Sequence, residues 1–251
     1  MTELNDELPG AVLPANSPGN SLAGVKLFSG FAPDELSHIE QSCTWRKCKA
    51  GEEILTPQSS NRDVFFIADG EVRVVNYSLT GREVAYAELK SGDFFGELAA
   101  IDGEARSAAV VAHTTCIFAA LAPELFRAVI ADHPSVAIAL IEKLARIVRI
   151  CDDRIMDLAT LGAHQRVYRE LLKLVSEDPV RANSWLIYPM PTQAAIAAKA
   201  STTRETVARV MSQLANAGIV ERKSKTLYIR DLERLDRLVS NVGEAHETGG
   251  R

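Results

Sequence analysis

Two kinds of hydrophobic pattern divide the chain. Between residues 24 and 122, short runs rich in β-branched and aromatic residues alternate with turn signals, and the clearest runs are DVFFIADGEVRVV at 63–75 and SAAVVAHTTCIFAAL at 107–121. The turn signals are Ala50-Gly51, Asp69-Gly70, Thr80-Gly81, Ser91-Gly92-Asp93 and Asp102-Gly103. Turns at such regular intervals predict a compact β-roll or barrel.

From Pro123 the pattern becomes helical. In PSVAIALIEKLARIVRICDDRIMDLATL, apolar residues recur at spacings of three and four, namely Leu140, Leu144, Ile147, Cys151, Ile155 and Leu158. This periodicity predicts one long amphipathic helix. Such a helix packs its apolar stripe either against a twin in a parallel coiled coil or against its own β-roll, and we favour the twin.

The region 164–240 contains a pair of short helices. Thr192 begins the first helix, a tight turn follows at Ala200-Ser201, and the second helix starts at Thr202 or Thr203. Thr202-x-x-Glu205 fits a capping box, and Gly218 closes the helix.

The second of these helices has one buried and one exposed face. Its predicted buried stripe consists of Val207, Val210, Met211 and Leu214. The residues that must then point outward are Arg204, Glu205, Thr206, Arg209 and Gln213. The following segment, IVERKSKTLYI, predicts a hairpin whose tip carries Lys223 and Lys225.

Composition sets the outer limits of the molecule. With 251 residues and 47% hydrophobic content, the chain is long enough for two domains with their own cores. Its apolar runs are short and interrupted by charge, and its first residues, MTELNDELPG, do not resemble a signal peptide. Four scattered cysteines do not form a disulfide framework. We therefore expect a soluble, cytoplasmic protein with no membrane partner.

The charges are distributed unevenly. Residues 1–163 hold 14 Lys+Arg and 23 Asp+Glu, a net of −9, whereas residues 164–240 hold 13 and 8, a net of +5. An acidic module beside a basic one favours a polyanionic partner for the basic part.

A helix, a tight turn and a second helix with polar residues at its exposed start is a layout that reads the major groove of DNA. Arg204 and Arg209 can each donate a forked pair of hydrogen bonds to guanine, and Glu205 can accept from cytosine. The predicted phosphate contacts are Thr192, Thr203, Thr206, Lys223 and Lys225. We therefore predict binding to double-stranded DNA.

The sequence lacks the residue patterns that a metal site or a catalytic site would need. Cys43 and Cys48 have no third or fourth cysteine nearby, which argues against an iron–sulfur cluster. The five histidines are far apart in sequence, and no motif pairs a nucleophile with a base. We expect no metal site and no enzymatic activity.

RETVAR at 204–209, with its preceding turn and following hairpin, resembles the winged helix-turn-helix of the CRP/FNR family of bacterial transcription regulators. The resemblance covers about residues 24–235. It implies an α+β fold in which Arg204, Glu205 and Arg209 read TGTGA-like half-sites of an inverted repeat. The implied parts are a disordered N-terminal arm (1–23), a cyclic-nucleotide-binding β-roll (24–133), a dimerisation helix (134–162), a winged helix-turn-helix domain (163–240) and a disordered tail (241–251).

GELAAIDGEARSA at 96–108 resembles the phosphate-binding cassette of cyclic-nucleotide-binding domains. By this resemblance, Arg106 and Ser107 bind the cyclic phosphate with backbone N–H groups, and Glu97 accepts from the ribose 2′-hydroxyl. The remaining implied ligand residues are Gly96, Leu98 and Ala108. The alternative is a Glu97–Arg106 ion pair in a cassette that takes no ligand.

The base of the nucleotide is less defined by the resemblance. Family members that respond to cAMP carry a Thr-Ser pair on the dimer helix, and the matching positions here are Cys151 and Asp152. Asp152 can accept one bond from adenine or a forked pair from guanine, or it can face water or pair with Arg149 or Arg154. We expect cAMP as the effector, with cGMP or no ligand as the alternatives. The resemblance further implies a homodimer, and RNA polymerase as a partner if the protein activates transcription.

Overall fold

The computed structural model describes residues 9–14, 17, 19–78, 81 and 83–240. The chain forms two compact units, residues 1–147 and residues 148–251. The predicted tail at 241–251 and the first eight residues of the predicted arm lie outside the described residues.

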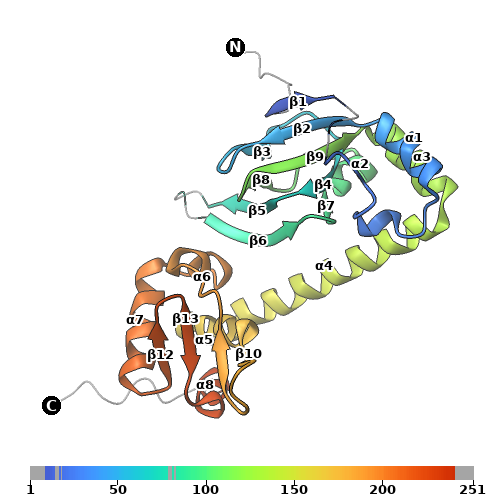
Figure 1. Ribbon diagram of the computed structural model, residues 1–251. Coiled ribbons are helices and arrows are strands. Elements are labelled where there is room, and N and C mark those ends of the chain that lie inside the picture. The colour runs from blue at the N-terminus through green and yellow to red at the C-terminus, as the bar shows by residue number, and fades with distance from the viewer. Residues whose placement is uncertain (1–8, 15–16, 18, 79–80, 82, 241–251) are drawn as a thin grey trace. The chain divides into compact units, whose positions relative to one another are not determined.

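The first unit is built on two antiparallel sheets (Figure 1). The five-stranded sheet has the order β1 (Ala11–Leu13), β2 (Thr44–Cys48), β9 (Cys116–Leu121), β4 (Val64–Asp69) and β7 (Phe94–Phe95). The four-stranded sheet has the order β3 (Glu53–Leu55), β8 (Ala109–Ala112), β5 (Glu71–Tyr77) and β6 (Glu83–Lys90). The regular turn signals thus correspond to a β-roll, as predicted.

Strand β4 shows why this roll has two cores. Its side chains alternate between faces. Phe65 and Ile67 pack in the cluster that includes residues of both sheets, and Val64 and Phe66 pack in a second cluster with helical residues. All four side chains are fully buried. A strand with both faces covered reads as a continuous apolar run, which explains the sequence VFFI.

Helices cover the outer face of the five-stranded sheet. They are the short 3₁₀ helix at Lys26–Phe28, α1 (Pro33–Gln41), α3 (Pro123–Asp132) and the start of α4 (Pro134–Thr160). The predicted long helix is therefore present as one element. Val136 and Leu140 of α4 are buried in the same cluster as Phe66, so the beginning of the stripe packs on its own β-roll.

The exposed apolar residues of α4 include positions outside the predicted stripe as well as its later members. Ile141, Val148 and Ile155 follow one another at intervals of seven residues and are 60%, 57% and 62% exposed. Cys151 and Leu158, which lie between and beyond them on the same heptad seam, are exposed as well. Within this chain, packing on the β-roll thus accounts for only the first part of the stripe.

The N-terminal segment differs from the predicted disordered arm. Strand β1 pairs antiparallel with β2, and Leu22 is completely buried in the helical cluster. The prediction for residues 1–23 is wrong at these positions, because a three-residue edge strand held by backbone hydrogen bonds needs no hydrophobic periodicity of its own.

The second unit is a helical module with a small sheet. It consists of α5 (Ala163–Leu174), β10 (Ser176–Glu177), β11 (Trp185–Ile187), α6 (Gln193–Lys199), α7 (Arg204–Asn216), β12 (Val220–Lys223), β13 (Thr226–Ile229) and α8 (Leu232–Ser240). The sheet order is β10-β11-β13-β12, so the predicted hairpin is the β12–β13 pair. No helix among the described residues is both long enough and apolar enough to cross a membrane.

Candidate functional site

The cassette predicted at residues 96–108 is a short helix entered through a glycine. Gly96 lies between β7 and α2 (Glu97–Asp102) with a φ of 85°, a left-handed conformation that favours glycine. A Cβ atom at Gly96 would lie 2.8 Å from both Arg106 Nη1 and the backbone oxygen of Asp63. Glycine is therefore required here by conformation and by space.

Arg106 is the buried cation of this cassette. It is only 5% exposed, and its guanidinium donates to the Gly96 carbonyl at 2.9 Å, to Asn61 Oδ1 at 2.9 Å and to the Asp63 carbonyl at 2.8 Å. All three acceptors are neutral groups. Nε is buried and has no hydrogen-bond partner among the described residues.

Burial dominates the electrostatics of Arg106. Burial first, and then the charge of Arg62, lower the pKa of Arg106, and Asp63 and Glu97 partly offset them; the pKa that results is about 10. The group stays charged at neutral pH. A desolvated cation surrounded by neutral acceptors is suited to binding an anion.

Glu97 is buried too, but its partner is not Arg106. Its Oε1 atom lies 3.1 Å from Nζ of Lys143, which comes from α4. The structure thus contradicts the Glu97–Arg106 ion pair considered as an alternative. A different cation neutralises the carboxylate, which leaves the guanidinium without an ion-pair partner among the described residues.

The other predicted cassette residues differ in exposure. Ala108 is buried directly before β8, whereas Leu98 and Ser107 are exposed. Cys151 and Asp152 are exposed on the part of α4 that belongs to the second unit, so the cassette cluster is formed without them. Among the described residues, no group of three or more His, Cys, Asp or Glu side chains is arranged to hold a metal ion.

Three residues of this cluster were missed by the sequence analysis: Asn61, Asp63 and Lys143. Asn61 and Asp63 precede strand β4, and Lys143 is one of several charged residues on α4. Their positions carry no local spacing signal, because only the folded chain brings them to Gly96, Glu97 and Arg106.

The second unit contains the predicted helix-turn-helix. Thr192 caps α6 by accepting a hydrogen bond from the Ala195 N–H at 3.1 Å. Thr203, not Thr202, caps α7, and it accepts from the Thr206 N–H at 3.2 Å. The predicted capping box at Thr202 is therefore wrong: this residue is buried in the turn, where its N–H donates to the Ala197 carbonyl.

The faces of α7 agree with the prediction. Val207, Val210 and Leu214 are buried, and Met211 packs against them as a partly buried residue. Arg204, Glu205 and Arg209 are exposed, and Thr206 is half-buried. Hydrogen bonds from its own backbone N–H and from Thr203 lower the pKa of Glu205, which is therefore an ionised acceptor at neutral pH.

The β12–β13 hairpin is basic at its tip. Lys225 is exposed there, next to Ser224, whose φ is 53°. Lys223 lies 2.9 Å from Glu221 Oε1, and Arg230 donates to Oε2 of the same carboxylate. Lys223 is thus engaged in an exposed ion pair within the hairpin.

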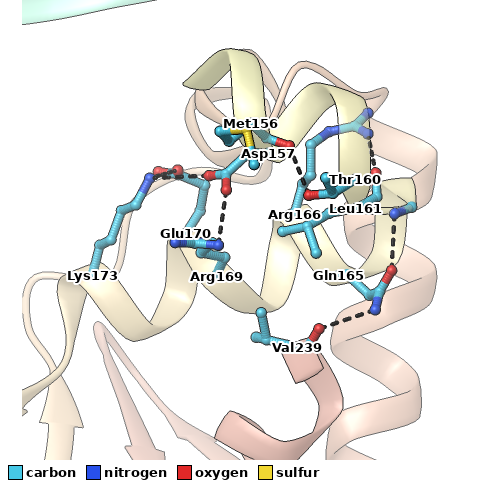
Figure 2. Close-up of polar contacts among 11 residues, drawn as sticks. Met156, Asp157, Thr160, Leu161, Gln165, Arg166, Arg169, Glu170, Lys173 and Val239 are labelled. Atoms are coloured by element: carbon cyan, nitrogen blue, oxygen red, sulfur yellow. Dashed lines mark hydrogen bonds and ion pairs between the residues drawn. The ribbon is translucent and has the colours of Figure 1, made fainter. Parts of the chain in front are cut away.

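A polar cluster joins the end of α4 to α5 within the second unit (Figure 2). The Asp157 carboxylate is largely buried and lies 2.9 Å from Nη1 of Arg169 and 3.8 Å from Nζ of Lys173. Arg166 donates to the Leu161 carbonyl at 2.8 Å and to the Ala200 carbonyl at 2.9 Å. These contacts hold the last turns of α4 and the helix-turn-helix together as one body.

The chain matches two family models. The cyclic nucleotide-binding domain matches residues 45–133, and the Crp-like helix-turn-helix domain matches residues 165–238. The cyclic AMP receptor protein of Thermus thermophilus is 32% identical over 222 residues, which cover 86% of this chain and 98% of that protein. The CRP-like cAMP-activated global transcriptional regulator of Mycobacterium tuberculosis is 25% identical, covering 86% of this chain and 97% of its own.

Solved structures give the same result. The transcriptional regulator TTHA1359 of the CRP/FNR family from Thermus thermophilus has 25% identity and a TM-score of 0.52, covering 79% of this chain and 100% of its own. A CooA mutant from Carboxydothermus hydrogenoformans shares the fold, with 19% identity and a TM-score of 0.71 over 93% of this chain and 98% of its own.

Two glycines of the cassette allow a matched test of its geometry. Gly96 and Gly103 are both left-handed, but a Cβ atom at Gly103 meets nothing within 4 Å. Gly103→Ala should therefore cost only the conformational strain of roughly 1–2 kcal/mol, whereas Gly96→Ala should cost clearly more, because the Asp63 backbone cannot move away freely. Urea unfolding followed by the fluorescence of buried Trp45, in a Trp185→Phe background, measures both. Equal losses would contradict the crowding at Gly96.

Proposed function

The chain belongs to the CRP/FNR family of transcription regulators, and we propose that a cyclic nucleotide bound at residues 96–108 controls its affinity for DNA. The observation that carries the proposal is the buried Arg106 guanidinium with its neutral acceptors and its unpaired Nε. A cyclic phosphate supplies the negative charge that this group lacks. Glu97, in the same cassette, supplies an acceptor for a sugar hydroxyl.

We propose cAMP as the effector. In support, the Thermus relative is named a cyclic AMP receptor protein and the Mycobacterium relative a cAMP-activated regulator. The alternative is cGMP, because Asp152 stands where a hydroxyl of cAMP-responsive members is expected and a carboxylate can accept a forked pair from guanine. Under this alternative, Asp152 raises the affinity for cGMP relative to cAMP. A second alternative is a regulator of the same fold that needs no ligand.

The proposed DNA target is an inverted repeat of TGTGA-like half-sites. Arg204, Glu205 and Arg209 project from the exposed face of α7, where a recognition helix contacts base edges. Thr192 and Thr203 cap α6 and α7. The free backbone N–H groups at the start of each helix favour binding of a DNA phosphate there. Lys223 and Lys225 add phosphate contacts from the hairpin. A regulator with this proposed activity acts in the cytoplasm and catalyses no reaction. If it activates transcription, RNA polymerase is a further partner.

The proposed assembly is a homodimer through α4. The exposed residues Ile141, Val148 and Ile155 repeat every seven positions, which is the spacing of a coiled-coil seam. Leu144, Cys151 and Leu158 occupy the second set of seam positions. A second copy of the same helix covers both sets, and two-fold symmetry of the dimer matches that of an inverted repeat.

Control of DNA affinity requires differential binding. A nucleotide shifts the equilibrium only as far as it binds the DNA-competent arrangement of the dimer more tightly than the other arrangement.

Replacing Arg106 tests the effector site. Arg106→Leu should abolish binding of cAMP and cGMP, because it removes the main charge opposite the phosphate, and it should leave the dimer intact. Calorimetry with both nucleotides measures the loss, and Arg73→Leu is the control, since Arg73 pairs with Glu83 between β5 and β6. Unchanged affinity in Arg106→Leu would show that the cassette is not the binding site.

Replacing a seam residue tests the dimer. Ile155→Glu should turn the dimer into a monomer, because it places a charge on each side of the two-fold axis in an apolar seam. Sedimentation velocity measures the mass, and Leu125→Glu, at an exposed apolar residue of α3, is the control that should stay dimeric. A dimer that tolerates Ile155→Glu must use another surface.

Replacing Arg204 tests the reading of bases. Arg204→Ala should cost about 1–3 kcal/mol on the inverted repeat and relax the preference at one base. Lys225→Ala should weaken binding to cognate and scrambled DNA alike, because a phosphate contact carries no sequence information. Fluorescence anisotropy on both DNAs, with half-sites about one helical turn apart, separates the two effects. If Arg204→Ala weakens the affinity for both DNAs equally, the exposed face of α7 does not determine base specificity.

A further inference from the structure

Lys143 is a buried cation whose role the proposed effector site does not assign. It comes from α4, yet its Nζ atom reaches into the cassette and lies 3.1 Å from Glu97 Oε1. The Lys143 side chain is 17% exposed and that of Glu97 is 7% exposed. Both residues belong to the first unit, so the contact lies within one compact body.

The ammonium group is fixed by more than its ion pair. Nζ also donates to the Phe94 carbonyl at 2.6 Å and lies 3.6 Å from the centroid of the Phe94 ring. Phe94 is a buried strand residue two positions before Gly96. Lys143 therefore holds its position relative to the entrance of α2 by contacts that do not depend on Glu97.

The ion pair with Lys143 affects how well the Glu97 carboxylate can accept a hydrogen bond. Lys143 contacts Oε1, which is one of the two oxygens of the Glu97 carboxylate. Burial lowers the pKa of Lys143, and the charge and hydrogen bond of Glu97 offset part of this effect. A buried carboxylate that loses its counter-charge becomes costly, so it turns towards solvent or is neutralised, and either change makes it a weaker acceptor.

We propose that Lys143 is a positioning residue that holds Glu97 as a charged, aimed acceptor and thereby makes the cassette select a ribose over a 2′-deoxyribose cyclic nucleotide. The inference rests on the proposed function, since it requires that a cyclic nucleotide binds at residues 96–108. Lys143 itself does not contact the sugar in this proposal. Its effect passes through Oε2 of Glu97, which accepts the 2′-hydroxyl.

The opposite role for Lys143 would be competition with the ligand. In that case Lys143 would occupy Glu97 until a nucleotide displaced it, and removing Lys143 would strengthen the bond to the 2′-hydroxyl. The geometry favours positioning, because the lysine occupies one carboxylate oxygen and is anchored on Phe94 independently.

The test is a ratio of affinities. Calorimetry with cAMP and 2′-deoxy-cAMP gives the selectivity of the wild type, which we expect to be about tenfold or more, the factor that corresponds to about 1.4 kcal/mol. In Lys143→Met the ratio should fall below about threefold, since this side chain has similar length and no charge. Lys143→Arg should restore most of the ratio. Lys26→Met is the matched control, because Lys26 forms an exposed pair with Asp93 in the same unit and should leave the ratio unchanged.

A second comparison shows whether the effect passes through Glu97. In a Glu97→Gln background, which removes the charged acceptor, Lys143→Met should change the ratio no further. An additional loss in this background would mean that Lys143 contacts the sugar itself and would overturn its role as a positioning residue. If Lys143→Met does not fold, as judged by circular dichroism, Lys143→Gln replaces it, because glutamine keeps a polar donor without the charge.

The outcomes separate this inference from the proposed function. A wild type that binds neither nucleotide overturns the proposed effector and this inference with it. A wild type that binds both, with a ratio that Lys143→Met leaves unchanged or raises, overturns the inference alone.

Discussion

The buried guanidinium of Arg106 is the constraint around which the cassette is built. A desolvated cation must be surrounded by acceptors, and here those acceptors are two backbone carbonyls and one amide oxygen. This requirement fixes the segment before β4 against the entrance of α2, and it explains why position 96 has no room for a side chain. The neutral character of the acceptors keeps the positive charge available for an anion.

The second buried charge follows from the first. Were Glu97 to pair with Arg106, the cassette would be neutral and would have little affinity for a phosphate. The carboxylate pairs instead with Lys143, so two cations and one anion lie close together, with a net charge of +1 from these three groups. The cassette therefore combines a cation that has no ion-pair partner among the described residues with a carboxylate acceptor, as the proposed binding of a phosphate and a sugar hydroxyl requires.

The features that could be predicted from the sequence are those that depend on residues close together in the chain. GELAAIDGEARSA contains the helix, its glycines and Arg106, and the α7 stripe at Val207, Val210 and Leu214 follows from helical spacing alone. The sequence did not reveal the partners Asn61 and Lys143, because 45 residues separate Asn61 from Arg106 and 46 separate Lys143 from Glu97. Thr202-x-x-Glu205 fits the capping-box pattern, but the fold buries Thr202 in the turn and Thr203 caps the helix.

Helix α4 contributes side chains to both units. Val136, Leu140 and Lys143 belong to the first unit, where they meet the helical cluster and the cassette. Arg154 and Asp157 belong to the second, where they meet the turn of the helix-turn-helix and α5. Each unit is thus fastened to its own part of one continuous helix. Since Lys143 contacts the carboxylate of the cassette directly, a ligand that changes the position of Glu97 acts on the same helix that carries the proposed dimer seam.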